Sequence, residues 1–423
     1  MLETDESTET DAAELSVGNH TLISSLGLFL LTLVLTVVFH FWRTHQSVWW
    51  IEVGFILSAA TFISILISEA CDPFADAAQW VGIRLKLPSS VRGATLDAIA
   101  SSMPELFTGL FFVTVALSGS KDSAQRVLES AEGYGSTVAT CAGSSIYNLI
   151  LIPAVCAIAM AFSRPKQPYI EVEREVVHRD GMWVIFTQLG LLVFLYQSKL
   201  SWWMGVVALL AYAGYVLHLY IATLRFRTRL ASGEIERDEP NQTATVLFGS
   251  KEVRLNGWTS AMILIISTGV AALACYLLVD LTNQSAHKLK VSPFFVAVIL
   301  TAAVSSIPDT FMSLGSARRG DDSGAMSNVF GSNIFDICIG MSIPLLVSCY
   351  LNDWQPIIWI DSANQELSGV VGLRVLLFVF TAVAMGSMWY FRRITMRTGI
   401  VFCALYALFV AYAVLGALGW INV

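Results

Sequence analysis

The sequence predicts an all-α polytopic membrane protein. We expect an inverted repeat of two five-helix halves plus one extra N-terminal transmembrane helix, about 11 spans in all. Composition, the spacing of hydrophobic runs and an internal duplication support this fold class. Hydrophobic residues make up 55% of the 423 residues and charged residues 13%, with a mean hydropathy of +0.65. These values are typical of membrane proteins and unlike those of soluble domains.

Charge and cysteine content argue against other classes. The net charge of -7 comes largely from an acidic N-terminal tail, so the sequence gives no indication of a nucleic-acid partner. The seven cysteines lie mostly within apolar runs and have no metal-ligand or disulfide spacing. The partner that the composition does indicate is the lipid bilayer.

The hydrophobic runs divide the chain into five regions. Residues 1–20 are expected to be an acidic disordered tail, and 21–42 an extra N-terminal span that is retained, because it lacks a basic leader. The first repeat half is 48–224, a cytoplasmic loop 225–256, and the second half 257–423. The spans expected within the halves are 48–71, 88–118, 133–162, 181–196 and 201–224, then 257–280, 291–317, 324–351, 370–391 and 399–420.

Lys and Arg residues set the expected orientation. If the loop 225–256 is cytoplasmic, most of the basic residues fall in loops on that same side, as the positive-inside rule requires. An odd number of spans then separates the equivalent ends of the two halves. The halves therefore enter the membrane in opposite directions, which makes the repeat an inverted one.

A short polar motif occurs twice within these spans. Ser101-Ser102-Met103-Pro104-Glu105 recurs 204 positions later as Ser305-Ser306-Ile307-Pro308-Asp309. A buried carboxylate is costly at bilayer depth, and proline removes a helical hydrogen bond. Duplicated, interrupted helices of this kind indicate a transporter ion site near the membrane midplane.

The helices next to the motif also repeat. Gly143 to Asn148 matches Gly331 to Asp336 at a shift of 188. Helical spacing places the motif's hydroxyls and carboxylate on one face with an alanine, whose carbonyl a proline kink can free. The candidate ion ligands are Glu105, Asp309, Asp336, Asn148, Ser101, Ser102, Ser305, Ser306, Ser144, Ser332, Ala98 and Ala302.

This ligand set consists of oxygen atoms only. Carboxylate, amide, hydroxyl and carbonyl oxygens suit Ca²⁺ and similar hard cations, and the absence of histidine and cysteine argues against soft transition metals. Three carboxylates in a low-dielectric site need cations for charge neutrality. The sequence therefore predicts exchange of one ion for another rather than the return of an empty site.

The duplicated segments also resemble a known family. GATLDAIASSMPELFTGL with GSSIYN, and SSIPDTFMSLGSARRG with GSNIFDICIGMSIP, are similar to the two alpha repeats of the calcium/cation antiporter superfamily, the sodium/calcium exchangers. The second repeat is most similar to the potassium-dependent branch. The resemblance implies that Glu105 and Asp309 are the central Ca²⁺ carboxylates and that Asp336 is the position linked to potassium dependence.

The resemblance implies a secondary active antiporter that exchanges Ca²⁺ for Na⁺ by alternating access, with K⁺ transport as a further option. It implies no enzymatic activity and no cofactor other than the transported ions. A multi-pass protein of the plasma membrane is expected, with an organelle membrane as the alternative. The oligomeric state is left open.

Three other functions fit the sequence less well. A Ca²⁺/H⁺ exchanger is disfavoured because the asparagine-rich motif of that branch is absent. A cation channel is disfavoured by the inverted repeat, and an intramembrane enzyme by the lack of a Ser/His or paired-His motif. Asp97 is open to two interpretations, a pathway carboxylate or a structural polar contact, for instance with Arg92.

Overall fold

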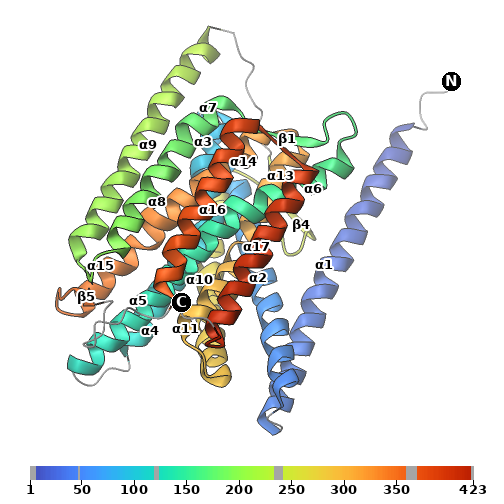
Figure 1. Cartoon of the computed structure of the whole chain (residues 1–423). Coiled ribbons are helices and arrows are strands. Elements are labelled where there is room, and N and C mark those ends of the chain that lie inside the picture. Colours follow the sequence, from blue (N-terminus) through green and yellow to red (C-terminus); the bar gives the residue numbers. More distant parts are fainter. Residues whose placement is uncertain (1–5, 46–47, 119–122, 233–241, 359–368, 421–423) are drawn as a thin grey trace, which may run out of the picture.

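The computed structural model describes residues 6–45, 48–118, 123–232, 242–358 and 369–420 (Figure 1). Ten helices in these ranges are long and apolar enough to span a membrane. The all-α polytopic fold class is therefore confirmed. The strands in the described ranges form three short two-stranded sheets.

The first half contains five helical segments, four of them corresponding to candidate spans. They are α2 (Trp49–Arg84); α3 (Ser89–Arg92), η1 (Gly93–Asp97) and α4 (Ala98–Ser118); α5 (Ser123–Ile146), η2 (Tyr147–Leu151) and α6 (Ile152–Ser163); α7 (Arg174–Val176), η3 (Val177–Gly181) and α8 (Met182–Leu195); and α9 (Trp202–Ala231). The segments labelled η are π-helical.

The second half follows the same plan. Its helices are α10 (Gly257–Leu289); α11 (Pro293–Val296), η4 (Ala297–Thr301), α12 (Ala302–Ser305) and α13 (Ile307–Arg318); α14 (Asp322–Phe335), η5 (Asp336–Gly340) and α15 (Ser342–Leu351); α16 (Val370–Phe391); and α17 (Met396–Ala417). The strands are β1 (Tyr169–Glu171), β2 (Lys199–Leu200), β3 (Thr243–Val246), β4 (Lys251–Arg254), β5 (Ile357–Ile358) and β6 (Arg393–Thr395).

The N-terminal helix differs from its prediction at one end. Helix α1 is Glu6–His45, so the backbone is helical in most of the region 1–20 expected to be disordered. Acidic residues are ordinary helix formers near a helix N-terminus, which gives a physical reason for the difference. The membrane-spanning part, Ser25–His45, corresponds to the predicted extra span 21–42. In Figure 1, α1 stands at the edge of the molecule beside α2.

The fourth helix of the first half is shorter than a complete span. Helix α8 has 14 residues, whereas an α-helix needs about 20 to cross the hydrocarbon core. It continues directly from η3 and α7, so the helical segment as a whole extends from Arg174 to Leu195. Its first turns carry Arg174, Glu175, Arg179 and Asp180, and the segment is not among the ten helices of the described ranges that are long and apolar enough to span a membrane.

Strand pairing confirms that the two halves are inverted. β1, after the third helix of the first half, pairs with β6, after the fourth helix of the second half. β2 and β5 show the reciprocal pairing, because β2 follows the fourth helix and β5 the third. The connections before and after a spanning helix lie on opposite sides of the membrane. Corresponding connections of the two halves therefore lie on opposite sides.

Helices α2 and α10 form an antiparallel pair. At one end, Arg43 Nη2 donates to Gln284 Oε1 at 2.7 Å, near the end of α10, and its guanidinium stacks 4.0 Å over the ring of Phe55, near the start of α2. Toward the other end, Glu69 Oε2 accepts a hydrogen bond from the Phe248 backbone at 2.9 Å, between the strands that precede α10.

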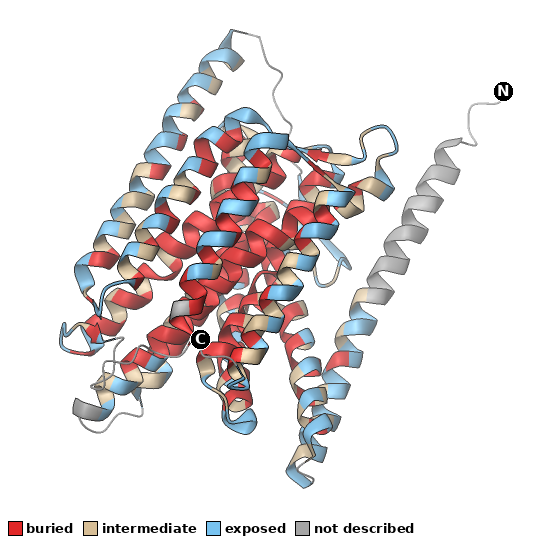
Figure 2. Ribbon diagram, in the orientation of Figure 1, coloured by how far each residue is buried: buried red, intermediate tan, exposed pale blue. Residues whose placement is uncertain are grey.

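The buried core is centred on α5 and α14. Figure 2 shows buried residues concentrated in the crossing helices at the centre, while the outer helices expose one face. A Cβ on Gly143 would lie 2.5 Å from Val298 O, and a Cβ on Gly331 would lie 2.5 Å from Ala94 O. These are equivalent crossings in the two halves. Glycine permits the close helix approach that brings the duplicated motifs together.

Candidate functional site

The candidate site lies where helices with π-helical segments meet. η1 and η4 immediately precede Ala98 and Ala302, and each is related to the other by the same shift of 204 that relates the motifs. η2 contains Asn148 and η5 begins at Asp336. Single-turn π-bulges occur frequently at functional sites. The sequence predicted distortion near the prolines but not these segments.

The two proline motifs have different backbones. In the second half the helix is interrupted at Ser306, which has φ -89° and ψ 0° and separates α12 from α13. In the first half α4 continues through Pro104. The predicted interruption is therefore found in the second half, whereas the equivalent helix of the first half stays continuous.

Glu105 accepts hydrogen bonds from both halves of the protein. Its Oε1 atom lies 3.1 Å from Ser144 Oγ on α5 and 3.3 Å from Ser306 Oγ, and all three residues are fully buried. Ser306 Oγ also lies 2.8 Å from Ser144 Oγ. The carboxylate of one motif thus contacts a hydroxyl of the other.

Asp309 also contacts hydroxyls of the opposite motif and of a core helix. Its Oδ1 atom accepts hydrogen bonds from Ser101 of the first motif and, at 2.5 Å, from Ser332 on α14. Ser101 also lies 2.9 Å from the carbonyl of Asp97, one helical turn earlier. Each carboxylate is therefore held by a hydroxyl of the opposite motif and by a hydroxyl of an adjacent core helix.

Asp336 is connected through Ser144 to the cluster formed by Glu105, Ser144 and Ser306. The Ser144 hydroxyl lies 3.0 Å from Asp336 Oδ2, and Asn148 Nδ2 lies 3.4 Å from the same hydroxyl. Ser144 has a single hydroxyl hydrogen, so it can donate to either Glu105 or Asp336 but not to both at once.

Buried oxygens without partners mark the site most clearly. In the described part of the chain, five buried oxygens of predicted ligands have no hydrogen-bond partner: Ser102 Oγ, Glu105 Oε2, Asn148 Oδ1, Asp309 Oδ2 and Asp336 Oδ1. A buried oxygen without a donor is costly, and oxygens of this kind are what a hard cation requires.

Other predicted ligands are bonded within their own helices. Ser305 Oγ donates to Ala302 O at 3.3 Å, and Ser101 Oγ lies 3.4 Å from Ala98 O. Among the described residues, no three His, Cys, Asp or Glu side chains are grouped closely enough to hold a metal ion. Hydroxyl and amide oxygens are therefore needed to complete an ion cage here.

Asp97 lies at the entry to the site helix and is 5% exposed. Gln79 Nε2 lies 3.2 Å from each of its carboxylate oxygens, while Arg92 Nη1 donates to Leu87 O at 2.9 Å. The bonds to Gln79 agree with the interpretation of Asp97 as a structural polar contact. The contact between Gln79 on α2 and Asp97 was not predicted, because the sequence does not show which helices lie side by side.

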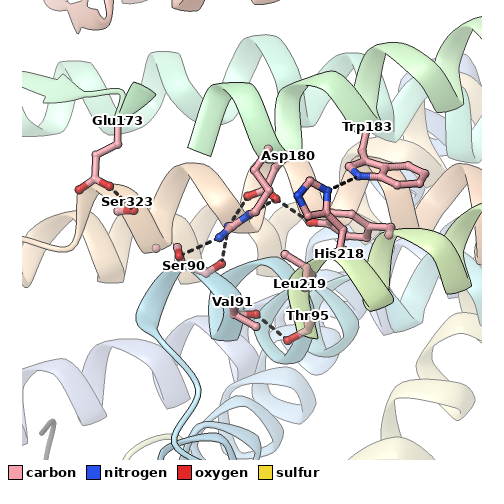
Figure 3. Close-up of polar contacts among 12 residues, drawn as sticks. Ser90, Val91, Thr95, Glu173, Asp180, Trp183, His218, Leu219 and Ser323 are labelled. Atoms are coloured by element: carbon pink, nitrogen blue, oxygen red, sulfur yellow. Dashed lines mark hydrogen bonds and ion pairs between the residues drawn. The ribbon is translucent and has the colours of Figure 1, made fainter. Parts of the chain in front are cut away.

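An ion pair in η3 that contacts the start of the site helix was also missed. Arg179 and Asp180 are both buried and lie 2.7 Å apart; Figure 3 shows the cluster around Asp180 and Ser90. Arg179 donates to the Ser90 hydroxyl at 3.2 Å, and Tyr215 donates to Asp180 at 3.2 Å. The predicted span 181–196 leaves Arg179 and Asp180 in the loop before it. Adjacent opposite charges at the start of an apolar run were the available signal.

The chain is similar in sequence and in fold to known membrane proteins. The sodium/calcium exchanger protein family model matches residues 53–221 and 259–415. An uncharacterized membrane protein of Methanocaldococcus jannaschii is 24% identical over 347 residues, which cover 82% of this chain and 94% of the relative. The fold also resembles the sodium-calcium exchanger NCX_Mj soaked with Na⁺ and Ca²⁺, with a TM-score of 0.51 and 21% identity over 82% of this chain and 95% of that one.

Sodium/potassium/calcium exchangers match shorter stretches of the chain. Sodium/potassium/calcium exchanger 1 of Bos taurus is 31% identical over 156 residues, 37% of this chain and 11% of the relative. The human sodium/potassium/calcium exchanger 2 is 32% identical over 145 residues, 34% of this chain and 21% of the relative. The relatives named by activity are ion exchangers rather than enzymes. The chain therefore belongs to the sodium/calcium exchanger protein family.

Proposed function

We propose that the protein is a secondary active antiporter that exchanges Ca²⁺ for Na⁺ at the site between the two proline motifs. The single observation that supports this function best is the set of five buried, unpartnered oxygens within the duplicated motifs and their neighbouring helices. A dehydrated cation in such a site replaces water with about six to eight protein oxygens if it is Ca²⁺.

Each predicted ligand has a proposed role. Glu105 and Asp309 bind Ca²⁺ centrally, because both are fully buried and each keeps one carboxylate oxygen free of donors. Ser102, Asn148 and Asp336 add oxygens from the surrounding helices. The carbonyls and hydroxyls that complete the Na⁺ and Ca²⁺ sites belong to Ala98, Ala302, Ser101, Ser144, Ser305, Ser306 and Ser332.

Ion competition for these oxygens produces exchange. Three carboxylates at this depth are strongly unfavourable without compensating cations. The ion-free protein should therefore not switch its site from one side of the membrane to the other. Release of Ca²⁺ then requires its replacement by Na⁺. The antiparallel pair α2 and α10 is proposed to belong to a gating bundle that rocks against the site-bearing core and exposes the site alternately to each side.

Potassium is proposed to accompany Ca²⁺. Ca²⁺ plus one monovalent cation neutralises the formal charges of Glu105, Asp309 and Asp336 together. The similarity to proteins named sodium/potassium/calcium exchangers supports the same assignment. Asp336 stands where the first half has Asn148, so the additional charge belongs to the second half.

The proposed location is the plasma membrane, with the loop 225–256 in the cytoplasm. The excess of basic residues in the loops on that side supports this orientation. It would place β1, β6 and the β3–β4 hairpin on the inner face, and β2 and β5 on the outer face.

Uptake of ⁴⁵Ca²⁺ into Na⁺-loaded proteoliposomes tests the function. We expect an outward Na⁺ gradient to drive saturable uptake, and Glu105→Gln and Asp309→Asn to reduce it to the level of empty liposomes. Asp280→Asn is the matched control, because this exposed carboxylate on α10 accepts a hydrogen bond from Gln284 at 2.7 Å and lies outside the site motifs.

The other functions give different results in the same experiment. Uptake that ignores Na⁺ and follows a pH gradient would identify a Ca²⁺/H⁺ exchanger. A flux that does not saturate and needs no counter-ion would identify a channel. Either result contradicts Na⁺/Ca²⁺ exchange.

A further inference from the structure

A second chain of buried polar side chains lies beside the ion site and has no role in the proposed exchange mechanism. It joins Thr381 on α16, Gln188 on α8, Ser145 on α5 and Asn333 on α14. These side chains are 8%, 2%, 0% and 0% exposed, respectively. Polar groups at this depth are costly unless they are hydrogen-bonded, so four of them in sequence across four helices require an explanation.

Each hydrogen bond in the chain has a defined direction. The Thr381 hydroxyl donates to Gln188 Oε1, Gln188 Nε2 donates to Ser145 Oγ at 2.6 Å, and the Ser145 hydroxyl donates to Asn333 Oδ1. Asn333 Nδ2 then donates to the backbone carbonyl of Val329 at 2.8 Å. The chain therefore ends on the backbone of α14 and fixes the orientation of the Asn333 amide.

Ser145 and Asn333 are neighbours of ion-site residues without sharing their free oxygens. Ser145 follows Ser144, and Asn333 follows Ser332, which donates to Asp309. The amide oxygen of Asn148 is buried without a partner, whereas that of Asn333 accepts the bond from Ser145. Asn148 is thus available to a cation, and Asn333 is committed to holding α5 against α14.

The position of this pair in the repeat is also informative. Ser145 and Asn333 are equivalent residues, 188 positions apart, and they bond to each other. They therefore lie at the axis that relates the two halves. Gln188 and Thr381 belong to the fourth helix of each half, and both line a cavity of about 320 Å³ between α8 and α16 that is otherwise almost entirely apolar.

We propose that Ser145, Asn333, Gln188 and Thr381 form a positioning network that sets the spacing of Ser144 and Ser332 and thereby the relative affinity for Ca²⁺ and Na⁺. This proposal rests on the proposed function. Partners of metal ligands orient those ligands and strongly influence metal affinity. A change in the spacing of α5 and α14 affects Ca²⁺ more than Na⁺, because Ca²⁺ gathers oxygens from both motifs and both core helices.

Three substitutions separate this role from simple packing. Thr381→Val removes the hydroxyl that orients Gln188, whereas Thr381→Ser retains it. Thr187→Val is the matched control, because Thr187 is also buried on α8 but donates only within its own helix, to Trp183 O at 2.9 Å and Val184 O at 3.1 Å.

The measurements are the half-saturating Ca²⁺ and Na⁺ concentrations for exchange in proteoliposomes and the rise in Tm that Ca²⁺ produces in detergent. For Thr381→Val we expect about a tenfold higher half-saturating Ca²⁺, less than about a threefold change for Na⁺, and a smaller Ca²⁺-dependent rise in Tm. Thr381→Ser and Thr187→Val should stay within about twofold of the unmodified protein.

A Thr381→Val protein with the same Ca²⁺ to Na⁺ affinity ratio as Thr187→Val would overturn the proposal. If Thr381→Val does not fold, Gln188→Leu is tested by the same ratio, and an unchanged ratio has the same meaning. If the unmodified protein shows no Na⁺-driven uptake, the proposed function fails. The Ca²⁺-dependent Tm then still decides the positioning role, since it needs binding and no transport.

Discussion

Ser144 has one proton and two buried carboxylate neighbours. Its hydroxyl lies 3.1 Å from Glu105 Oε1 and 3.0 Å from Asp336 Oδ2, so when both carboxyl groups are ionised one of these contacts brings two lone pairs together. A cation between the oxygens removes this conflict, because it attracts both. The hydrogen-bonding pattern itself therefore favours an occupied site over an empty one.

Asp336→Asn is predicted to abolish potassium dependence while preserving Na⁺-driven Ca²⁺ uptake. The substitution gives the second half the residue that the first half has at Asn148, and it leaves two carboxylates that one Ca²⁺ can neutralise. We expect the half-saturating Ca²⁺ to change by no more than about tenfold. The measurement is ⁴⁵Ca²⁺ uptake into Na⁺-loaded proteoliposomes with K⁺ present or replaced by a large organic cation.

The experiment has a control variant and an outcome that would contradict the prediction. Asp280→Asn should keep the potassium response of the unmodified protein, because its carboxylate is exposed on α10. An Asp336→Asn protein that still requires K⁺ would show that the monovalent ion binds elsewhere.

At the scale of helices, the closest crossings determine where the site forms. Gly143 on α5 meets the backbone of η4, and Gly331 on α14 meets the backbone of η1. Both contacts involve a carbonyl oxygen of the backbone, which cannot rotate away as a flexible side chain can. The distance between the crossing helices at the site is therefore possible only because Gly143 and Gly331 have no side chain.

Gly331→Ala is predicted to destabilise the protein by about 1 to 3 kcal/mol, the usual range for overpacking. The new Cβ would lie 2.5 Å from Ala94 O and 2.8 Å from Ala94 Cα. Gly190→Ala on α8 is the control, since no described atom lies within 4 Å of a Cβ there. Alanine also has the higher helix propensity, so the control should be neutral or slightly stabilising.

Thermal unfolding in detergent distinguishes the two substitutions. We expect a lower Tm for Gly331→Ala and an unchanged or higher Tm for Gly190→Ala. Equal values for the two proteins would contradict the close crossing of α14 and η1.

The sequence predicts much of the fold and the candidate site but not their details. A carboxylate within an apolar span is costly, and this identified Glu105 and Asp309 as candidate ligands. The duplication of the motif indicated that both belong to one site. Bonds between helices, such as that of Ser145 with Asn333, depend on how helices pack and leave no periodic signal. The π-helical segments and the continuity of α4 through Pro104 were unpredictable for the same reason.

At the scale of the whole molecule, inversion explains how two similar halves build one site. Each motif's carboxylate is held by a hydroxyl of the opposite motif, Glu105 by Ser306 and Asp309 by Ser101. Ser306 corresponds to Ser102 rather than Ser101, so these two motif contacts are similar but not equivalent. The contacts with the core helices, Glu105 with Ser144 and Asp309 with Ser332, join equivalent positions and fit a two-fold relation between the halves. In the proposed alternating-access mechanism, exchanging the conformations of two halves related in this way would turn an outward-open site into an inward-open one.

Lys86 and Lys290 offer a direct test of inversion. They are equivalent residues that end α2 and α10, both are exposed, and both have left-handed backbones with φ of 56° and 57°. Inversion predicts that they lie on opposite sides of the membrane, Lys86 in the cytoplasm and Lys290 outside. Cysteine replaces lysine at similar backbone cost, so Lys86→Cys and Lys290→Cys should both fold.

Labelling with a membrane-impermeant maleimide in intact cells shows on which side of the membrane each introduced cysteine lies. The background is Cys403→Ser, because the other native cysteines are buried. We expect Lys290→Cys to react before permeabilisation and Lys86→Cys only after it. Reaction of both from the same side would mean that the two halves are parallel and would contradict the inverted repeat. Reaction from opposite sides but in the reverse order would keep the inverted repeat and turn the whole molecule over, with the loop 225–256 outside.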